Sequence, residues 1–166
     1  MTRRLRSISF SICLLLFVAG LSASTLSAQT LQVVDADGHS TTLTAAQIAN
    51  LPHVAVDARD HDGDARFDGV PLSALLPAAG IPLGDTLRGP RMTEVLLVSA
   101  ADGYEVAFAL AEIDPAFAMR QIILADKRDG RTLDAKQGPF RIVASGDKRP
   151  ARWIRQVTEM RVIAVK

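Results

Sequence analysis

Short runs of alternating apolar and polar residues dominate this chain, and turn signals separate the runs. An Asp-Gly pair between two such runs is typical of a tight β-hairpin. The pattern predicts two hairpins: Leu31–Val34 with Thr41–Leu43 around Asp37-Gly38, and Glu94–Ala100 with Tyr104–Phe108 around Asp102-Gly103. Further strands are predicted at His53–Ala58, Gln121–Ala125, Phe140–Ala144 and Val157–Val165, with Val157, Glu159, Arg161 and Ile163 alternating against their neighbours in the last.

Helical signals are short. Thr44 and Gln47 fit a capping box, and Pro52 ends the helix that they open. Leu72–Ala79 has helical spacing, with Pro71 as its first residue and Gly80 closing it. We expect one or two helical turns at Ala109–Asp114 and a polar loop at Arg59–Asp68. Short strands interleaved with short helices, without regular βαβ spacing, favour an α+β or mainly β domain.

The first 28 residues have the composition of a secretory signal. Arg3, Arg4 and Arg6 precede the apolar run Ile12–Leu21, which is too short to span a bilayer. We expect cleavage after Ala28, with a cut near Ala23 or an uncleaved anchor as alternatives. The protein is then periplasmic or secreted, and residues 29–166 form a single domain with no second apolar run long enough to span a membrane.

Charge and cysteine content exclude several functions. Residues 29–166 hold 16 basic and 18 acidic residues, which is not the profile of a nucleic-acid-binding protein. The single cysteine, Cys13, lies in the predicted signal peptide. Residues 29–166 therefore contain no disulfide, no thiolate metal ligand and no cysteine nucleophile.

The two signs of charge are separated along the chain. Residues 29–126 hold five basic and 14 acidic residues, whereas residues 127–166 hold 11 basic and four acidic residues. Such a separation favours either internal pairing of the two halves or an oriented anionic ligand, and the charges alone do not decide between them.

A basic stretch near the carboxyl end is the main candidate site. Guanidinium groups bind phosphate or carboxylate, and the Gly146-Asp147 turn presents backbone N–H groups. We predict an anion site formed by Arg141, Lys148, Arg149, Arg152 and Arg155, with Trp153 packed behind the site or stacked on the ligand. Its occupant is a small anionic ligand or an acidic protein partner. The alternative is a solvated loop, and the sequence does not fix the oligomeric state.

Acidic residues between positions 57 and 68 suggest a metal site at first sight. An EF-hand loop starting at Asp60 would need Gly and Glu where Ala65 and Pro71 stand, so that match fails. We therefore predict no metal site. If a metal is bound, His53 and Asp57 are the candidates, and His53 and His61 with a carboxylate could hold zinc or copper. A flexible acidic loop that meets a basic partner or the protein's own basic half is favoured instead.

Several segments together resemble the oxidoreductase molybdopterin-binding domain family, which has the fold of sulfite oxidase and its bacterial relatives. The resemblance covers roughly residues 31–164. It is carried by Phe67-Asp68-Gly69-Val70-Pro71-Leu72, Val95–Val106, Ile122–Gly130, Gly138-Pro139-Phe140-Arg141-Ile142-Val143 and Trp153–Val157, the last similar to the segment that follows the family's phosphate-contacting turn.

The resemblance implies an exported α+β domain, rich in mixed β-sheet, that clasps a pyranopterin cofactor. In the family, the pterin dithiolene and one cysteine thiolate hold molybdenum, and the cysteine is expected on or after the strand His53–Arg59. No thiol stands there. We therefore expect a non-catalytic module that binds an anion or pterin or docks a partner. The alternative is a small periplasmic molybdenum oxidoreductase in which Asp57 or His53 replaces the thiolate.

Overall fold

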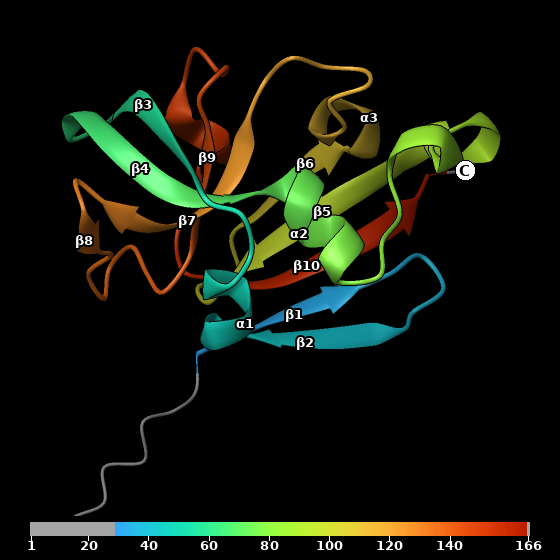
Figure 1. Cartoon of the computed structure of the whole chain (residues 1–166), viewed down its shortest axis with the longest axis horizontal. Helices are drawn as coiled ribbons and strands as arrows, with labels where there is room; N and C mark the ends of the chain where they lie inside the picture. Colours follow the sequence, from blue (N-terminus) through green and yellow to red (C-terminus); the bar gives the residue numbers. More distant parts are fainter. Residues whose placement is uncertain (1–28, 166) are drawn as a thin grey trace, which may run out of the picture.

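Two β-sheets and three short α-helices make up the described part of the chain (Figure 1). The computed structural model describes residues 29–165, and the predicted signal peptide lies outside the described residues. No helix within residues 29–165 is long and apolar enough to cross a membrane. The α+β class, β-rich with mixed strand directions and short helices, is confirmed.

The first sheet joins the two ends of the described chain. Its order is β2-β1-β10-β5-β6, and β1 and β10 pair in parallel whereas the other neighbours pair antiparallel. Both predicted Asp-Gly hairpins are present, and β10 lies between them. The bounds are β1 Thr30–Val34, β2 Ser40–Thr44, β5 Glu94–Ala100, β6 Glu105–Ala109 and β10 Val157–Ala164.

The second sheet carries the residues that later form the candidate site. Its order is β3-β4-β7-β8, and β9 also pairs with β7. All of these pairs are antiparallel. The bounds are β3 Val54–Asp60, β4 Gly63–Pro71, β7 Ile122–Arg128, β8 Arg131–Thr132 and β9 Arg141–Ala144.

The helices are short and pack against one hydrophobic core shared by both sheets. They are α1 Ala45–Ala49, α2 Leu72–Ala78 and α3 Leu110–Ile113, with 3-10 turns at Gly84–Thr86, Gly89–Thr93 and Pro150–Arg152. The predicted capping box at α1 is confirmed, because Thr44 Oγ1 accepts from the Gln47 backbone N–H and Gln47 Oε1 accepts from the Thr44 N–H. On α2, Leu72, Leu75 and Leu76 are fully buried, as their helical spacing predicts.

The predicted polar loop at Arg59–Asp68 is wrong, because this segment forms the β3–β4 hairpin. The chain reverses at Asp60–Gly63, where Gly63 has a φ of 110° that only glycine adopts freely. Ala65 and Phe67 alternate inward with exposed neighbours, so the segment carries a normal strand pattern. The density of aspartates hides this pattern in the sequence.

Two smaller predictions also need correction. Pro71 is the residue that caps α2 and not its first helical residue. In β10 the register shifts between Val157 and Glu159, so the predicted alternation is interrupted there: Val157 is buried, and beyond the shift Met160 and Val162 are buried while Arg161 and Ile163 are exposed. A β-bulge inserts one residue and changes which positions face the core.

Gly69 sits where β4 and β7 approach most closely. A Cβ added at this position would lie 2.3 Å from the Leu124 carbonyl oxygen and 2.5 Å from Ala125 Cα. The β4–β7 register also shifts between Asp68 and Gly69. Only glycine fits this contact without moving the backbone of the neighbouring strand.

We expect the Gly69→Ala substitution to lower the free energy of unfolding by about 2–4 kcal/mol, because β7 must shift to admit the methyl group. Urea denaturation followed by circular dichroism measures this change. Gly146→Ala is the control, since its added Cβ would lie 3.4 Å from Arg120 Cβ, an ordinary contact. Equal stabilities of the two variants would contradict the close approach at Gly69.

Candidate pocket at the end of the second sheet

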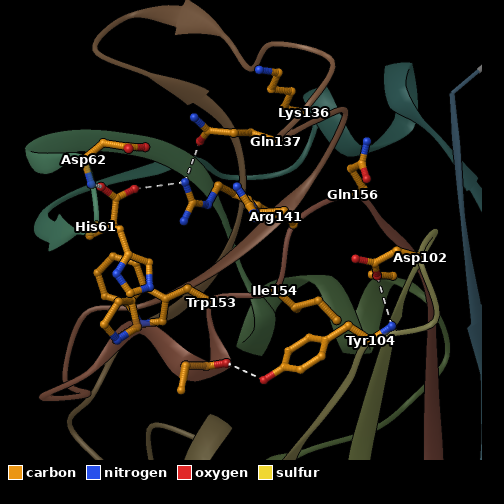
Figure 2. A pocket seen from close by; sticks show the side chains of 15 residues that line it. His61, Asp62, Asp102, Tyr104, Lys136, Gln137, Arg141, Trp153, Ile154 and Gln156 are labelled. Atoms are coloured by element: carbon orange, nitrogen blue, oxygen red, sulfur yellow. Dashed lines mark hydrogen bonds and ion pairs between the residues drawn. The ribbon is translucent and has the colours of Figure 1, made fainter.

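A pocket of about 410 Å³ opens where four segments that are distant in sequence meet (Figure 2). The segments are the tip of the β3–β4 hairpin, the β5–β6 turn, the stretch before and into β9, and the stretch that leads to β10. Its lining residues are Asp60, His61, Asp62, Ala100, Asp102, Tyr104, Lys136, Gln137, Arg141, Pro150, Ala151, Trp153, Ile154, Arg155 and Gln156.

Arg141 is the central polar group of this pocket. It lies on β9 among buried strand residues and is only 4% exposed. Its Nη1 donates to Asp60 Oδ2 at 3.1 Å and to Gln137 Oε1. Its buried Nε has no hydrogen-bond partner among the described residues. Both hydrogen bonds from the guanidinium to described residues come from Nη1. The guanidinium group is therefore only partly satisfied by the protein.

Asp60 is the buried carboxylate that neutralises this arginine. Its side chain is 4% exposed and also accepts from Arg128 Nη1 at 3.4 Å. Arg128 makes further ion pairs with Asp62 and Asp129, but both of those carboxylates are more than half exposed, so water screens them. Two largely buried guanidinium groups thus share one buried carboxylate.

Phe67 on β4 supports both guanidinium groups. Its ring centroid lies 4.9 Å from Arg141 Cζ and 5.5 Å from Arg128 Cζ. The Trp153 ring meets Phe67 edge-on at 6.1 Å, and its indole N–H donates to the Ala144 carbonyl oxygen at 2.9 Å. Trp153 is buried, and the contact with Phe67 and the hydrogen bond from its indole N–H hold it in place. It forms one wall of the pocket.

Electrostatics at the pocket oppose the charge on Arg141. Burial lowers its pKa, and the neighbouring charges of Arg128 and Arg155 lower the pKa further, whereas Asp60 raises it. An anion in the pocket would act in the same direction as Asp60. The site therefore has more buried positive charge than the protein compensates.

The structure separates the residues of the predicted basic site. Arg141, Trp153 and Arg155 line the pocket, whereas Lys148 and Arg149 are exposed and lie outside its lining. The Pro150–Arg152 turn is a single 3-10 turn that does not continue to Arg155. Arg152 and Arg155 therefore do not share a helical face, which sequence spacing alone would allow.

Arg152 belongs to a second ion network. It donates to both oxygens of Asp147 at 2.8 and 2.9 Å and to Glu112 Oε1 at 2.9 Å, and its Cζ lies 4.5 Å from the Phe108 ring centroid. The hydrogen bonds that Arg152 donates to Asp147 and Glu112 raise its pKa, although burial opposes them. Arg120 joins the same two carboxylates. These contacts fix the chain before β10.

Among the candidate metal ligands, His61 lines the pocket, whereas His53 and Asp57 do not. Asp57 is an exposed strand residue that pairs with Arg66 at 3.3 Å. His53 precedes β3 and faces Asp126 on β7. A third group, Asp35, Asp37 and His39, gathers in the exposed β1–β2 turn, where Asp35 Oδ1 accepts from the backbone N–H of His39. That backbone hydrogen bond lowers the pKa of Asp35.

The acidic half and the basic half of the chain do meet, as one of the two charge hypotheses predicts. Asp60 and Asp62 from the acidic half pair with Arg128 and Arg141 from the basic half. Sequence reasoning missed Gln137 and Lys136 as pocket residues and did not distinguish Asp60 from its neighbours. Position 60 is the last residue of β3, and no local pattern marks its side chain as buried.

Residues 25–165 match the family described as the oxidoreductase molybdopterin binding domain. The chain belongs to this family.

A solved structure agrees with that assignment. The sulfane dehydrogenase SoxCD from Paracoccus pantotrophus is similar in fold, with a TM-score of 0.64 and 17% sequence identity over 82% of this chain. The match covers only 38% of that chain. The predicted sulfite-oxidase-like fold is thus confirmed, and the likeness at this identity concerns the fold alone. No curated protein matches the chain.

The residues present do not fit the family's metal centre. Residues 29–166 contain no cysteine, and β3 and the hairpin after it carry no thiol that would replace one. The imidazole of His53 and the carboxylate of Asp57 lie outside the pocket lining. The pocket does offer cationic side chains and an aromatic wall, which suit the anionic and organic parts of a ligand.

We expect Asp60→Asn to lower the free energy of unfolding by about 3–5 kcal/mol, because it leaves Arg141 buried without a counter-charge. Urea denaturation measures the loss. Asp62→Asn at the same hairpin tip is the control, since that side chain is 67% exposed, and should cost about 0–1 kcal/mol. Similar losses in both variants would show that the Arg141–Asp60 pair does not hold the hairpin.

Proposed function

We propose that this protein is an exported, non-catalytic ligand-binding module that holds a small phosphorylated or carboxylated organic anion in the pocket around Arg141. The observation that carries the proposal is the buried Arg141 guanidinium, whose Nε has no partner within the described residues. Arg141 lines the pocket and shares its one buried carboxylate with Arg128, so an anion in the pocket would offset positive charge that the protein leaves only partly paired.

A comparison of the two phenylalanine-backed arginines supports this role. Arg152 uses Nε, Nη1 and Nη2 in hydrogen bonds to carboxylates of the protein. Arg141 uses only Nη1, although it is the more buried of the two. The chain therefore supplies enough acceptors to saturate Arg152, whereas Arg141, which lines the pocket, keeps a donor without an acceptor among the described residues.

The pocket is already organised before a ligand arrives. Asp60 and Gln137 fix Nη1, and Phe67 lies against the guanidinium group. Tyr104 is held by a hydrogen bond from its hydroxyl to the Ala151 carbonyl oxygen at 3.0 Å. Fixed donors bind an anion without a further loss of side-chain entropy. Lys136 and Arg155 at the rim attract it.

The pocket also has an apolar side. In Figure 2, Trp153, Ile154 and Tyr104 lie together on one side, and Lys136 and Gln137 lie on the other. A volume of about 410 Å³ is larger than an inorganic anion needs. Both features favour an organic anion, and the family makes a pterin phosphate, the organic part of molybdopterin, the first ligand to test.

The non-catalytic part of the proposal rests on the missing thiol. An alternative function, a molybdenum oxidoreductase with His53 or Asp57 as the metal ligand, has no support from the pocket lining. Docking of an acidic protein partner would rely on the exposed Lys148 and Arg149.

We expect the Lys136→Ala/Arg155→Ala double variant to bind a pterin phosphate at least about tenfold more weakly than the wild type, which corresponds to about 1.4 kcal/mol. Isothermal titration calorimetry measures the affinity, with inorganic phosphate as the smaller probe. The matched control is Lys148→Ala/Arg149→Ala, which removes the same charge outside the pocket. If the control weakens binding as much, or if neither probe binds the wild type, the pocket is not the anion site.

The protein purified from its native cells should contain no stoichiometric molybdenum, because no thiolate is available to complete the metal site. Elemental analysis and native mass spectrometry of the same sample test this together. A co-purified mass of a pterin phosphate without molybdenum would support the module. One molybdenum per chain, with oxidase or reductase turnover, would contradict its non-catalytic part.

A further inference from the structure

A second polar site lies away from the pocket, where the segment before β3 meets β7. His53 Nε2 faces Asp126 Oδ2 at 3.5 Å, and the other oxygen, Asp126 Oδ1, is buried without a hydrogen-bond partner. Neither residue lines the pocket around Arg141. The proposed anion binding makes no use of this pair.

The hydrogen bonds of His53 fix what its Nε2 offers. Nδ1 lies 2.8 Å from the Leu51 carbonyl oxygen. A carbonyl oxygen only accepts, so Nδ1 must carry the proton. In the neutral imidazole, Nε2 is then a bare lone pair that faces a carboxylate, and two acceptors face each other. A positive species between them removes this conflict.

We propose that His53 and Asp126 bind a divalent transition-metal ion, with zinc as the reference case. Zinc lies about 2.0–2.2 Å from imidazole nitrogen and carboxylate oxygen, so two ligand atoms of a tetrahedral site are separated by about 3.4 Å. The observed 3.5 Å matches that separation. The Nδ1–H donation to a backbone carbonyl is also the arrangement that orients a metal-ligating histidine.

The backbone explains why Asp126 points to this place. The β4–β7 register shifts between Asp68 and Gly69, whose partners are Lys127 and Ala125, so Asp126 is the extra residue of a bulge. A bulge redirects a side chain out of the regular alternation. The side chains of His53 and Asp126 are 26% and 22% exposed, so an ion can enter from solvent. Water would complete its coordination.

Ligand chemistry defines the class of ion. One imidazole nitrogen with a carboxylate favours zinc, copper or nickel over magnesium, which prefers oxygen ligands alone. A proton on His53 would also resolve the conflict between the two acceptors. The test must therefore distinguish a metal site from a simple imidazolium–carboxylate pair.

Zinc titration of the full chain by isothermal titration calorimetry tests the site. We expect one zinc per chain at this site, binding at least about tenfold weaker in His53→Gln and in Asp126→Asn, and no competition by magnesium. His61→Gln is the matched control, because His61 lines the pocket around Arg141 and lies outside the His53–Asp126 pair. Its zinc affinity should equal that of the wild type. Unchanged affinity in the first two variants, or loss in the control, would overturn the proposal.

A second measurement needs no variant. Zinc added to the wild type should shift the imidazole nitrogen resonance of His53 Nε2 in a nitrogen NMR spectrum, and leave those of His39 and His61 unchanged. Shifts confined to His39 or His61, or no shift at saturating zinc, would overturn the metal site and leave His53 and Asp126 as an imidazolium–carboxylate pair. Binding of pterin phosphate is unaffected by either result, so the two proposals fail independently.

Discussion

Burial of the Arg141 guanidinium inside a β-sheet is the constraint on which the pocket end of the molecule depends. A buried charge needs a partner, and the partner is Asp60, 81 residues earlier in the chain. This pair connects the tip of the β3–β4 hairpin to β9. Phe67 lies against the same guanidinium, and Trp153 lies against Phe67. One ion pair therefore helps to position both Arg141 and the Trp153 wall of the pocket.

The same physical device occurs twice, with different outcomes. In each case a guanidinium group lies near a phenylalanine ring and pairs with at least one carboxylate from the acidic half of the chain. Around Arg152 the carboxylates of Asp147 and Glu112 saturate the donors, and the result is a rigid connection. Around Arg141 a single buried carboxylate is shared with Arg128. This incomplete pairing at a pocket is the difference on which the proposed anion site rests.

Local patterns predict much of the fold but little of the site. The Asp-Gly turns, the capping box at Thr44 and the apolar runs depend on neighbours in sequence, so the hairpins, α1 and the strands can be predicted. The β3–β4 hairpin was missed because its aspartates resemble a loop. Asp60 and Arg141 meet through sheet pairing across 81 residues, which no local pattern encodes. The arginines of the basic stretch do not form one site. The 3-10 turn ends at Arg152, which lies outside the pocket lining, whereas Arg155 lines the pocket.

The pocket around Arg141 is organised by an ion pair and not by a thiolate. Asp60 and Gln137 satisfy Nη1 of Arg141 from within the chain, so the folded state does not require a ligand to hold its buried charge. A bound anion would then add stability by mass action on a domain that is already folded. In a site where a thiolate and a metal carried the organisation, loss of the cysteine would disorder the pocket. Here the ion pair between Arg141 and Asp60 carries that organisation, and no thiol takes part in it within residues 29–165.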